Sequence, residues 1–208
     1  MLAATICATL AAAGKRVAAF KPAVTGLDDA PGEWLHDHLL LAGAASAGQA
    51  PEDISPVRFG PPVSPHLAAF LRDERIDPAD LLAAARAAAD GADAFVCEGV
   101  GGLLVPFAPN YTVRDLAVDL GLPVVIAARP GLGTINHSLL TIEAARAAGL
   151  DVRAVVLTPW PDAPGAVEGS NRETIAALGA VEVATLPFTS PAALREAGSA
   201  LPVSEWVL

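Results

Sequence analysis

Charged residues and glycines stand directly after several apolar runs of this sequence. Lys21 follows "RVAAF", and Glu98 follows "DAFVC". A lysine at the end of such a run offers a point charge for an anion or for negative charge that develops during a reaction, or it simply marks the surface end of the run. A carboxylate such as Glu98 suits Mg²⁺ as an oxygen ligand, and it suits equally well the capping of a neighbouring helix or loop.

Two glycine-rich stretches extend this pattern. Glu98 is followed by "GVGG", which lets a backbone approach a phosphate closely and favours the ligand role for Glu98. The stretch from Gly133 to Asn136 precedes a predicted helix, where free N–H groups and the positive end of the helix dipole attract a carboxylate or a phosphate. Ordinary N-capping by Thr134 or Asn136 is the alternative, and the two roles are compatible.

The elements that position these residues alternate along the chain. Apolar runs predict strands within 16–21, 92–102, 122–134, 151–158 and 181–188. Apolar spacing, capping residues and terminal glycines predict helices at 2–13, 33–45, 64–74, 77–91, 112–121, 135–149, 170–179 and 190–198, with 47–63 as a loop. This alternation indicates one α/β domain with a parallel sheet covered on both faces. Ligands of such sheets bind at the carboxyl ends of the strands, where Lys21 and Glu98 fall.

The composition excludes several classes of function. A net charge of −10 argues against a nucleic-acid partner. No apolar run is long enough to span a bilayer, and no basic residue precedes the first apolar stretch as in a signal peptide. Two cysteines, Cys7 and Cys97, are too few for a disulfide framework, and both stand in apolar runs. We therefore expect a cytoplasmic protein without a membrane partner.

Other motifs have simpler explanations. Asp37 lies between two histidines in a predicted helix, and its residue type alone favours a solvated helix face. Zinc is disfavoured there because successive residues of a helix do not share a face. Ser170 begins an S-x-x-E motif, which predicts a capping box at a helix start. The motifs of serine hydrolases, zinc proteases and Rossmann dehydrogenases are absent from the sequence.

Taken in order, these stretches resemble the dethiobiotin synthetase family, which acts in biotin synthesis. The most specific are "EGVGGLLVP" and "GLGTINHSLLT", supported by "KPAVTG", and similar stretches run along nearly the whole chain. The resemblance implies a homodimeric, single-domain, three-layer fold of the P-loop NTPase type. It implies ATP as co-substrate, Mg²⁺ as cofactor, and CO₂ or bicarbonate and 7,8-diaminopelargonic acid as substrates. The diamine forms a carbamate, ATP phosphorylates it, and ring closure gives dethiobiotin, ADP and phosphate.

The resemblance also implies roles for individual residues. Lys21 corresponds to a catalytic lysine near the carbamate and the γ-phosphate, and Thr25 to a residue that contacts the diamine. Asp37 and Glu98 correspond to acidic Mg²⁺ positions. The carboxylate tail of the substrate is held across the dimer interface by Gly133, Thr134, Ile135 and Asn136. The nucleotide positions are Asp37, Glu98, Gly101, Thr158, Pro187 and Phe188.

Two details stay open at this point. Many members of the family have Asn at the position of Thr158, so the nucleotide preference is undecided. Either Asn171 or Arg172 is a candidate to reach the substrate across the dimer.

The family begins with a strand and a Walker A loop, G-x-x-x-x-G-K-[ST], and a helix follows at once. In this sequence the predicted helix begins at residue 2, which places Met1 directly after the [ST] position. We expect a start assigned too late, so that residues 1–208 are an N-terminally incomplete domain that binds phosphate very weakly. Two alternatives remain: an inactive dimeric remnant that binds a small carboxylate, or an amidoligase of the cobyrinic acid synthase type. The latter usually carries a glutaminase domain, for which 208 residues leave no room.

Overall fold

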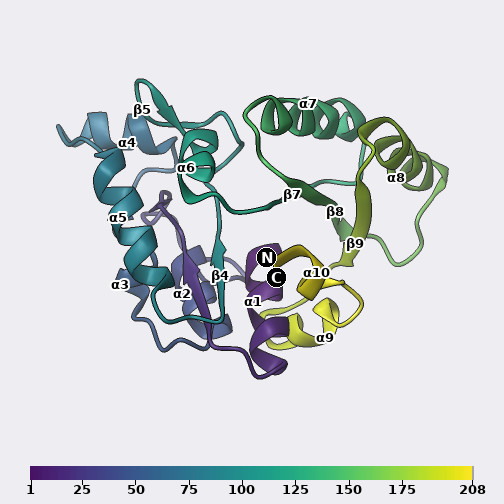
Figure 1. Cartoon of the computed structure of the whole chain (residues 1–208), viewed down its shortest axis with the longest axis horizontal. Coiled ribbons are helices and arrows are strands. Elements are labelled where there is room, and N and C mark those ends of the chain that lie inside the picture. Colours follow the sequence, from purple (N-terminus) through teal and green to yellow (C-terminus); the bar gives the residue numbers. More distant parts are fainter. Residues whose placement is uncertain (208) are drawn as a thin grey trace.

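Two groups of parallel strands form the centre of the molecule. The structure is a computed structural model that describes residues 1–207. Strand β1 (Val17–Phe20) pairs with β4 (Ala94–Cys97), while β7 (Val124–Ala128), β8 (Val152–Trp160) and β9 (Glu182–Pro187) form a second sheet in that order. Helices pack around both groups (Figure 1). The predicted α/β class, with parallel strands flanked by helices, is confirmed.

Two short strand pairs and the helices complete the fold. Strand β2 (Ala23–Val24) runs parallel to β3 (Val57–Arg58), and β5 (Pro106–Ala108) runs antiparallel to β6 (Tyr111–Thr112). The helices are α1 (Leu2–Ala12), α2 (Asp37–Ala44), α3 (Pro51–Ile54), α4 (Pro65–Leu71), α5 (Pro78–Ala89), α6 (Val113–Leu120), α7 (Thr134–Ala147), α8 (Ala166–Gly179), the 3₁₀ turn η1 (Pro191–Ala193), α9 (Leu194–Gly198) and α10 (Val203–Val207).

Helix α1 forms where the alanine-rich sequence predicts it. Leu2, Ile6 and Leu10 are spaced by four residues, so they share one face, and all three are buried. Gly14 follows the helix with a φ of 80°, a left-handed conformation that glycine adopts without strain. No side chain caps the amino end of α1. The buried face therefore holds this helix in place, rather than a capping interaction.

The helices differ from the sequence prediction in several places. Helix α2 begins at Asp37, not at residue 33, and the predicted loop 47–63 contains α3, which Pro51 starts from the first helical position. Helix α8 begins at Ala166, because Glu168 accepts a hydrogen bond from the Gly165 N–H at 2.8 Å and so closes the first turn. Ser170 consequently lies inside α8 and is not its capping residue.

The outer edge of β1 is covered by side chains in place of a strand. The Gln49 side chain accepts from the Ala19 N–H at 2.8 Å and donates to the Ala19 carbonyl at 3.0 Å. Ser46 Oγ accepts from the Val17 N–H at 2.9 Å. An unpaired strand edge invites pairing with another chain, and these contacts remove that hazard.

Replacing Gln49 with Ala is expected to lower the free energy of unfolding by about 1–2 kcal/mol. Both backbone groups of Ala19 lose their partners, and unpaired buried polar groups are costly. Urea denaturation followed by circular dichroism measures the change. Gln49→Glu is the matched control, since it keeps the acceptor and removes only the donor. If both variants unfold at the wild-type urea concentration, the amide does not stabilise this edge.

The buried core has three parts. One packs α1 and α2 against β1 and β8 and includes Leu10, Leu41 and Val156, while Phe107 belongs to a second part beneath α4 and α6. The third lies under α7 and α8 and includes Ile175. Within residues 1–207, no helix has the length and apolar character needed to cross a membrane.

Candidate active site

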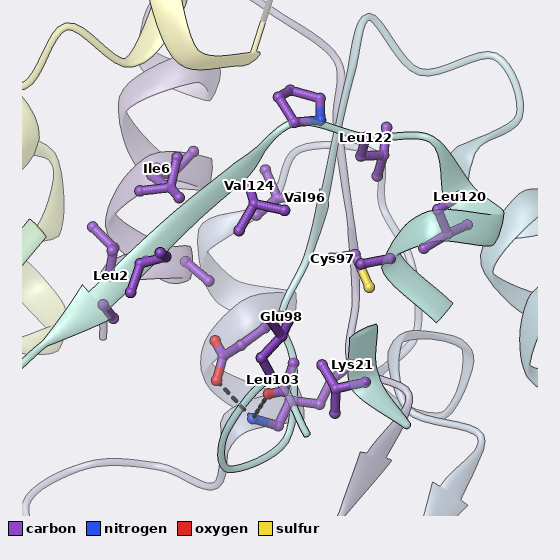
Figure 2. Close-up of a pocket in the computed structure, with 18 of the residues that line it drawn as sticks. Leu2, Ile6, Lys21, Val96, Cys97, Glu98, Leu103, Leu120, Leu122 and Val124 are labelled. Carbon is purple, nitrogen blue, oxygen red and sulfur yellow. Dashed lines mark hydrogen bonds and ion pairs between the residues drawn. The ribbon is translucent and has the colours of Figure 1, made fainter. Parts of the chain in front are cut away.

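The carboxyl ends of β1 and β4 bring Lys21 and Glu98 together. Phe20 is opposite Cys97 in the parallel ladder, so the next residue of each strand leaves the sheet beside the other. The Lys21 Nζ donates to Glu98 Oε1 at 2.6 Å, and Figure 2 shows this contact. The two residues that stand out in the sequence at strand ends therefore meet, as ligand sites of parallel sheets require.

Asp37 reaches the same ammonium group from α2. It is the first residue of that helix, where a negative charge interacts favourably with the helix dipole. Its Oδ2 lies 2.7 Å from Lys21 Nζ. Residue type alone predicted that Asp37 lies on a solvated helix face, and this prediction is wrong. The Asp37 carboxylate is partly exposed, but it is bound to the buried Lys21 ammonium group. Lys21, Asp37 and Glu98 are called the ion triad below.

The ion triad keeps Lys21 charged. Only 5% of Lys21 is exposed, and burial by itself lowers the pKa of its ammonium group. The negative charges of Glu98 and Asp37 outweigh burial, so the pKa of Lys21 is raised above its usual value. Burial likewise favours a higher pKa for Asp37, but the Lys21 ammonium group lowers that pKa below its usual value. Two carboxylates face one cation, so one negative charge is left to attract a further cation.

The ion triad is expected to stay intact from about pH 5 to pH 9. The pKa of Asp37 is lowered, so its stabilising effect is present above its unfolded pKa of about 3.9 and is lost as pH falls through the lower folded value. The pKa of Lys21 is raised, so its effect is present below about 10.4 and is lost as pH rises through the higher folded value.

Urea denaturation across pH measures this. The difference in unfolding free energy between the wild type and Asp37→Asn should be constant from about pH 5 to 9 and should shrink below about pH 4. A midpoint near neutral pH would show that Lys21 loses its proton there and would contradict the charged triad.

A glycine loop follows Glu98 and faces the ion triad. Lys21 Nζ also donates to the Gly99 carbonyl at 3.2 Å. Gly101 has a φ of 66°, and a Cβ there would stand 3.0 Å from Val105 Cγ2. Any residue larger than glycine at position 101 would therefore be strained, because it would adopt an unfavourable left-handed backbone conformation and crowd Val105.

The carboxylates of the triad suit Mg²⁺ better than a metal that needs a full protein cage. Asp37 and Glu98 each use one oxygen for Lys21, and within residues 1–207 their second oxygens, Oδ1 and Oε2, have no hydrogen-bond partner. The described residues contain no group of three or more potential His, Cys, Asp or Glu ligands. Mg²⁺ commonly binds through one or two carboxylates together with substrate phosphates and water, which this pair can accommodate.

A second polar site lies at the amino end of α7. Gly133 is the N-cap residue with a φ of 91°, and α7 begins at Thr134 without a side-chain cap. Capping by Thr134 or Asn136, the alternative considered above, therefore does not occur. In the described part of the chain, the N–H groups of Ile135 and Asn136 have no hydrogen-bond partner. Two such groups at a helix start are suited to binding a carboxylate.

Comparisons with known proteins place the chain in a family. The family described as "AAA domain" matches residues 3–191. A protein of Anaeromyxobacter dehalogenans named ATP-dependent dethiobiotin synthetase BioD is 40% identical over 183 residues, which cover 88% of this chain and 77% of that protein. The chain belongs to the ATP-dependent dethiobiotin synthetase family.

Relatives from other bacteria carry the same name. The protein of Bacillus velezensis is 34% identical over 162 residues, which cover 78% of this chain and 69% of the relative. The protein of Caulobacter vibrioides is 40% identical over 164 residues, which cover 76% of this chain and 74% of the relative. The resemblance seen in the sequence is thereby confirmed.

The structure assigns Asn171 and Arg172 to contacts within their own chain. Asn171 is buried, and its Nδ2 donates to the Pro130 carbonyl at 2.8 Å and to the Gly131 carbonyl at 3.3 Å. Arg172 donates from Nε to the Val183 carbonyl at 3.3 Å. Asn171 thus holds the loop that leads into α7.

The remaining predicted residues are spread over two adjoining cavities and their surroundings. Gly101 lines a cavity of about 510 Å³ with Lys21 and Glu98, while Thr134 lines a second cavity, of about 920 Å³. Ile126, Ala127 and Thr141 line both. Eight of the predicted positions are not among the described residues that line either cavity: Thr25, Asp37, Gly133, Ile135, Asn136, Thr158, Pro187 and Phe188.

The predicted nucleotide positions have distinct surroundings. Thr158 lies in β8 before a cis peptide bond to Pro159, and its buried Oγ1 has no hydrogen-bond partner among residues 1–207. Pro187 ends β9 opposite Trp160, and Phe188 is 64% exposed. The unpaired Thr158 hydroxyl and the exposed Phe188 ring are suited to contacting a nucleotide base, and this role stays a prediction.

Arg129 and His137 are the residues that the sequence analysis left without a role. Both line the second cavity, together with Thr134 and Ser138. Arg129 directly follows β7, so the strand-end rule that selected Lys21 and Glu98 also points to it. His137 lies one helical turn after Gly133.

Proposed function

We propose that this chain catalyses the dethiobiotin synthetase reaction: ATP- and Mg²⁺-dependent closure of 7,8-diaminopelargonic acid and CO₂ to dethiobiotin, ADP and phosphate. The observation that carries the proposal is the ion triad, a buried charged lysine held between two carboxylates beside a glycine loop. Three features support the assignment: the triad lies at the carboxyl ends of parallel strands, its carboxylates fit Mg²⁺, and the relatives bear this name.

The reaction needs an environment that stabilises negative charge. The carbamate formed from one amine and CO₂ is an anion, and its oxygen attacks the γ-phosphorus of ATP as the bond to ADP breaks. The second amine then attacks the carbamoyl carbon, phosphate leaves, and the amine loses its proton as the ring closes. Lys21 stays protonated and interacts with the carbamate and the phosphoryl oxygens throughout. Asp37 and Glu98 would hold Mg²⁺, which neutralises phosphate charge when it is bound.

The carboxylate tail of the substrate is assigned to the amino end of α7. The N–H groups of Ile135 and Asn136 and the dipole of a long helix supply the attraction, and Gly133 and Thr134 shape the turn. We assign Thr25 to the diamine. Gly101, Thr158, Pro187 and Phe188 are assigned to the nucleotide. The dimer in which this tail crosses between subunits, and a cytoplasmic location for a chain with free thiols at Cys7 and Cys97, are parts of the same proposal.

Replacing Asn171 with Ala is expected to raise the KM for diaminopelargonic acid about fivefold with kcat nearly unchanged. The loop at Pro130 and Gly131 loses a hydrogen bond of roughly 1 kcal/mol, and the α7 N–H groups then need reordering when the tail binds. Steady-state kinetics with varied diamine separates the two constants. The exposed neighbour Ser170 provides the control variant, Ser170→Ala. A fall in kcat with constant KM would place Asn171 in the chemistry instead.

ADP release in the presence of MgATP and bicarbonate, with and without diaminopelargonic acid, tests the proposed function. It is measured for residues 1–208 and for the same chain extended upstream to the next in-frame start. Diamine-dependent ADP release, matched by dethiobiotin in the mass spectrum, is the expected result. If both forms are folded and neither shows diamine-dependent turnover, the proposed enzymatic activity is rejected, and a carboxylate-binding protein is favoured instead.

A further inference from the structure

Arg129 is a cation without a partner, and it lines the second cavity, of about 920 Å³. It directly follows β7, where the chain turns toward α7 (Figure 1). Among residues 1–207, the Arg129 guanidinium makes no ion pair and no hydrogen bond, whereas Arg16, Arg146 and Arg153 each have a carboxylate or carbonyl partner. The charge of Arg129 is therefore not used to hold the fold together.

The cavity around Arg129 has no acidic side chain in its walls. No Asp or Glu is among the described residues that line it, although the sequence has 23 acidic and 13 basic residues. In a chain with this excess of negative charge, an arginine that has no carboxylate partner keeps its positive charge available to an anion that enters the cavity.

The rest of the lining suits the end of an aliphatic carboxylic acid. Ile126, Ala128 and Pro159 provide apolar walls. Thr134 and Ser138 are buried, and their hydroxyl oxygens lie 3.5 Å apart, so both hydroxyls are only weakly engaged with each other. Apolar walls with a few polar groups that converge are typical of small-molecule sites, and a carboxylate on an alkyl chain has the matching chemistry.

Lys21 is not available for the same task. It is the only other lysine or arginine among the described residues that line either cavity. Its ammonium group is already bound by Asp37 at 2.7 Å and by Glu98 at 2.6 Å. Under the proposed function, Lys21 interacts with the reacting end of the substrate, so Arg129 is the cation left for the opposite end.

We propose that Arg129 binds the carboxylate tail of the substrate and thereby selects substrates that carry an acid at the end of an aliphatic chain. This inference rests on the proposed function and adds a side chain to the α7 N–H groups assigned to that tail. Thr134, the first residue of α7, lines the same cavity as Arg129, so both sets of donors border one space.

A guanidinium contributes what backbone N–H groups lack. It has a full positive charge and a planar pair of donors that fits both oxygens of a carboxylate. A neutral tail, such as a primary amide, cannot form this charge-assisted pair. Arg129 therefore determines specificity for the acid, whereas the chemistry at the ion triad does not depend on it.

Steady-state kinetics with diaminopelargonic acid and its primary amide tests the role of Arg129. Arg129→Gln should raise the KM for the acid about tenfold or more and leave kcat and the KM for ATP nearly unchanged. The wild type should use the amide with a kcat/KM at least about tenfold lower than the acid, and Arg129→Gln should lower that value no further.

Two further variants complete the comparison. Arg129→Lys keeps the charge and should recover part of the affinity for the acid. Arg75→Gln is the matched control, because Arg75 is exposed and is not among the described residues that line either cavity. A wild-type KM in Arg129→Gln overturns the proposal. An equal loss with acid and amide also overturns it, since Arg129 would then not recognise the charge of the tail.

An NMR titration with heptanoate separates this inference from the proposed function. The amide shifts of Thr134 and Ser138 should report binding of heptanoate to the wild type, at least about fivefold weaker binding to Arg129→Gln, and weak binding of heptanamide to both. Binding of heptanoate that depends on Arg129, in a chain without diamine turnover, rejects the enzyme but retains the carboxylate site. Turnover with a KM that does not depend on Arg129 retains the enzyme and rejects this inference. Equal binding of heptanoate by the wild type and Arg129→Gln, or no binding by either, also overturns it.

Discussion

Replacing Lys21 with Gln is expected to lower kcat by about 10²–10³-fold in the form of the chain that turns over. Among residues 1–207, the buried Lys21 ammonium group is the one cation that contacts both carboxylates of the site. Removing a preorganised charge from a phosphoryl-transfer site costs on this order. Without Lys21, the carboxylates of Asp37 and Glu98 have no cation between them. Their positions are then held less firmly, and the net charge of the site becomes more negative.

Kinetics of three variants identify the cause of the loss. Lys15 is the only other lysine of the sequence, so Lys15→Gln is the matched control and should keep wild-type kcat. Lys21→Arg keeps the charge but replaces a compact ammonium group by a planar fork, so it should recover only part of the rate. Circular dichroism establishes that each variant is folded. A Lys21→Gln enzyme with wild-type kcat would remove Lys21 from the chemistry and limit the ion triad to a structural role.

The sequence predicts the part of the site that follows from strand geometry. Lys21 and Glu98 stand at the ends of apolar runs, and because neighbouring parallel strands end at the same edge, their contact follows from the pattern. Asp37 is different. It reaches Lys21 from α2, at the end of a long loop whose path no local pattern encodes, so spacing alone assigned it to solvent. Only the family resemblance predicted that Asp37 belongs to the same site as Lys21 and Glu98.

Boundaries and long-range contacts were the least predictable features. The S-x-x-E motif at Ser170 predicted a helix start, but Glu168 closes an earlier turn at Gly165 and moves the start of α8 to Ala166. The contacts of Asn171 with the loop before α7 join residues about forty positions apart, and Gln49 covers β1 from thirty positions away. Neither contact has a periodic signature, because each depends on how separate elements pack.

The packing of α9 against α1 provides the second large effect. Replacing Gly198 with Ala is expected to lower the free energy of unfolding by about 1–3 kcal/mol, and the melting temperature by roughly 2–10 °C. A Cβ at Gly198 would overlap Thr9 Oγ1 and lie 2.8 Å from Thr5 Cγ2. Thr9 cannot easily turn away, because its hydroxyl donates to the Thr5 carbonyl at 2.8 Å. The two helices must therefore separate, although α9 buries Leu194 in the same core as α1.

A double-mutant cycle tests whether the hydroxyl of Thr9 is the obstacle. Thr9→Ala removes the overlapping oxygen and introduces a better helix former, so alone it should change stability little, and combined with Gly198→Ala it should restore roughly 1 kcal/mol. Gly43→Ala is the matched control: Gly43 lies in α2 with open space around the added carbon, so that variant should be neutral or slightly stabilising. Additive effects of the Thr9 and Gly198 changes would show that α1 and α9 tolerate the extra carbon by another route. Helix α1 also lines the cavity of about 510 Å³ that contains Lys21 and Glu98. A separation of α1 from α9 is therefore expected to disturb this cavity and to reduce turnover along with stability.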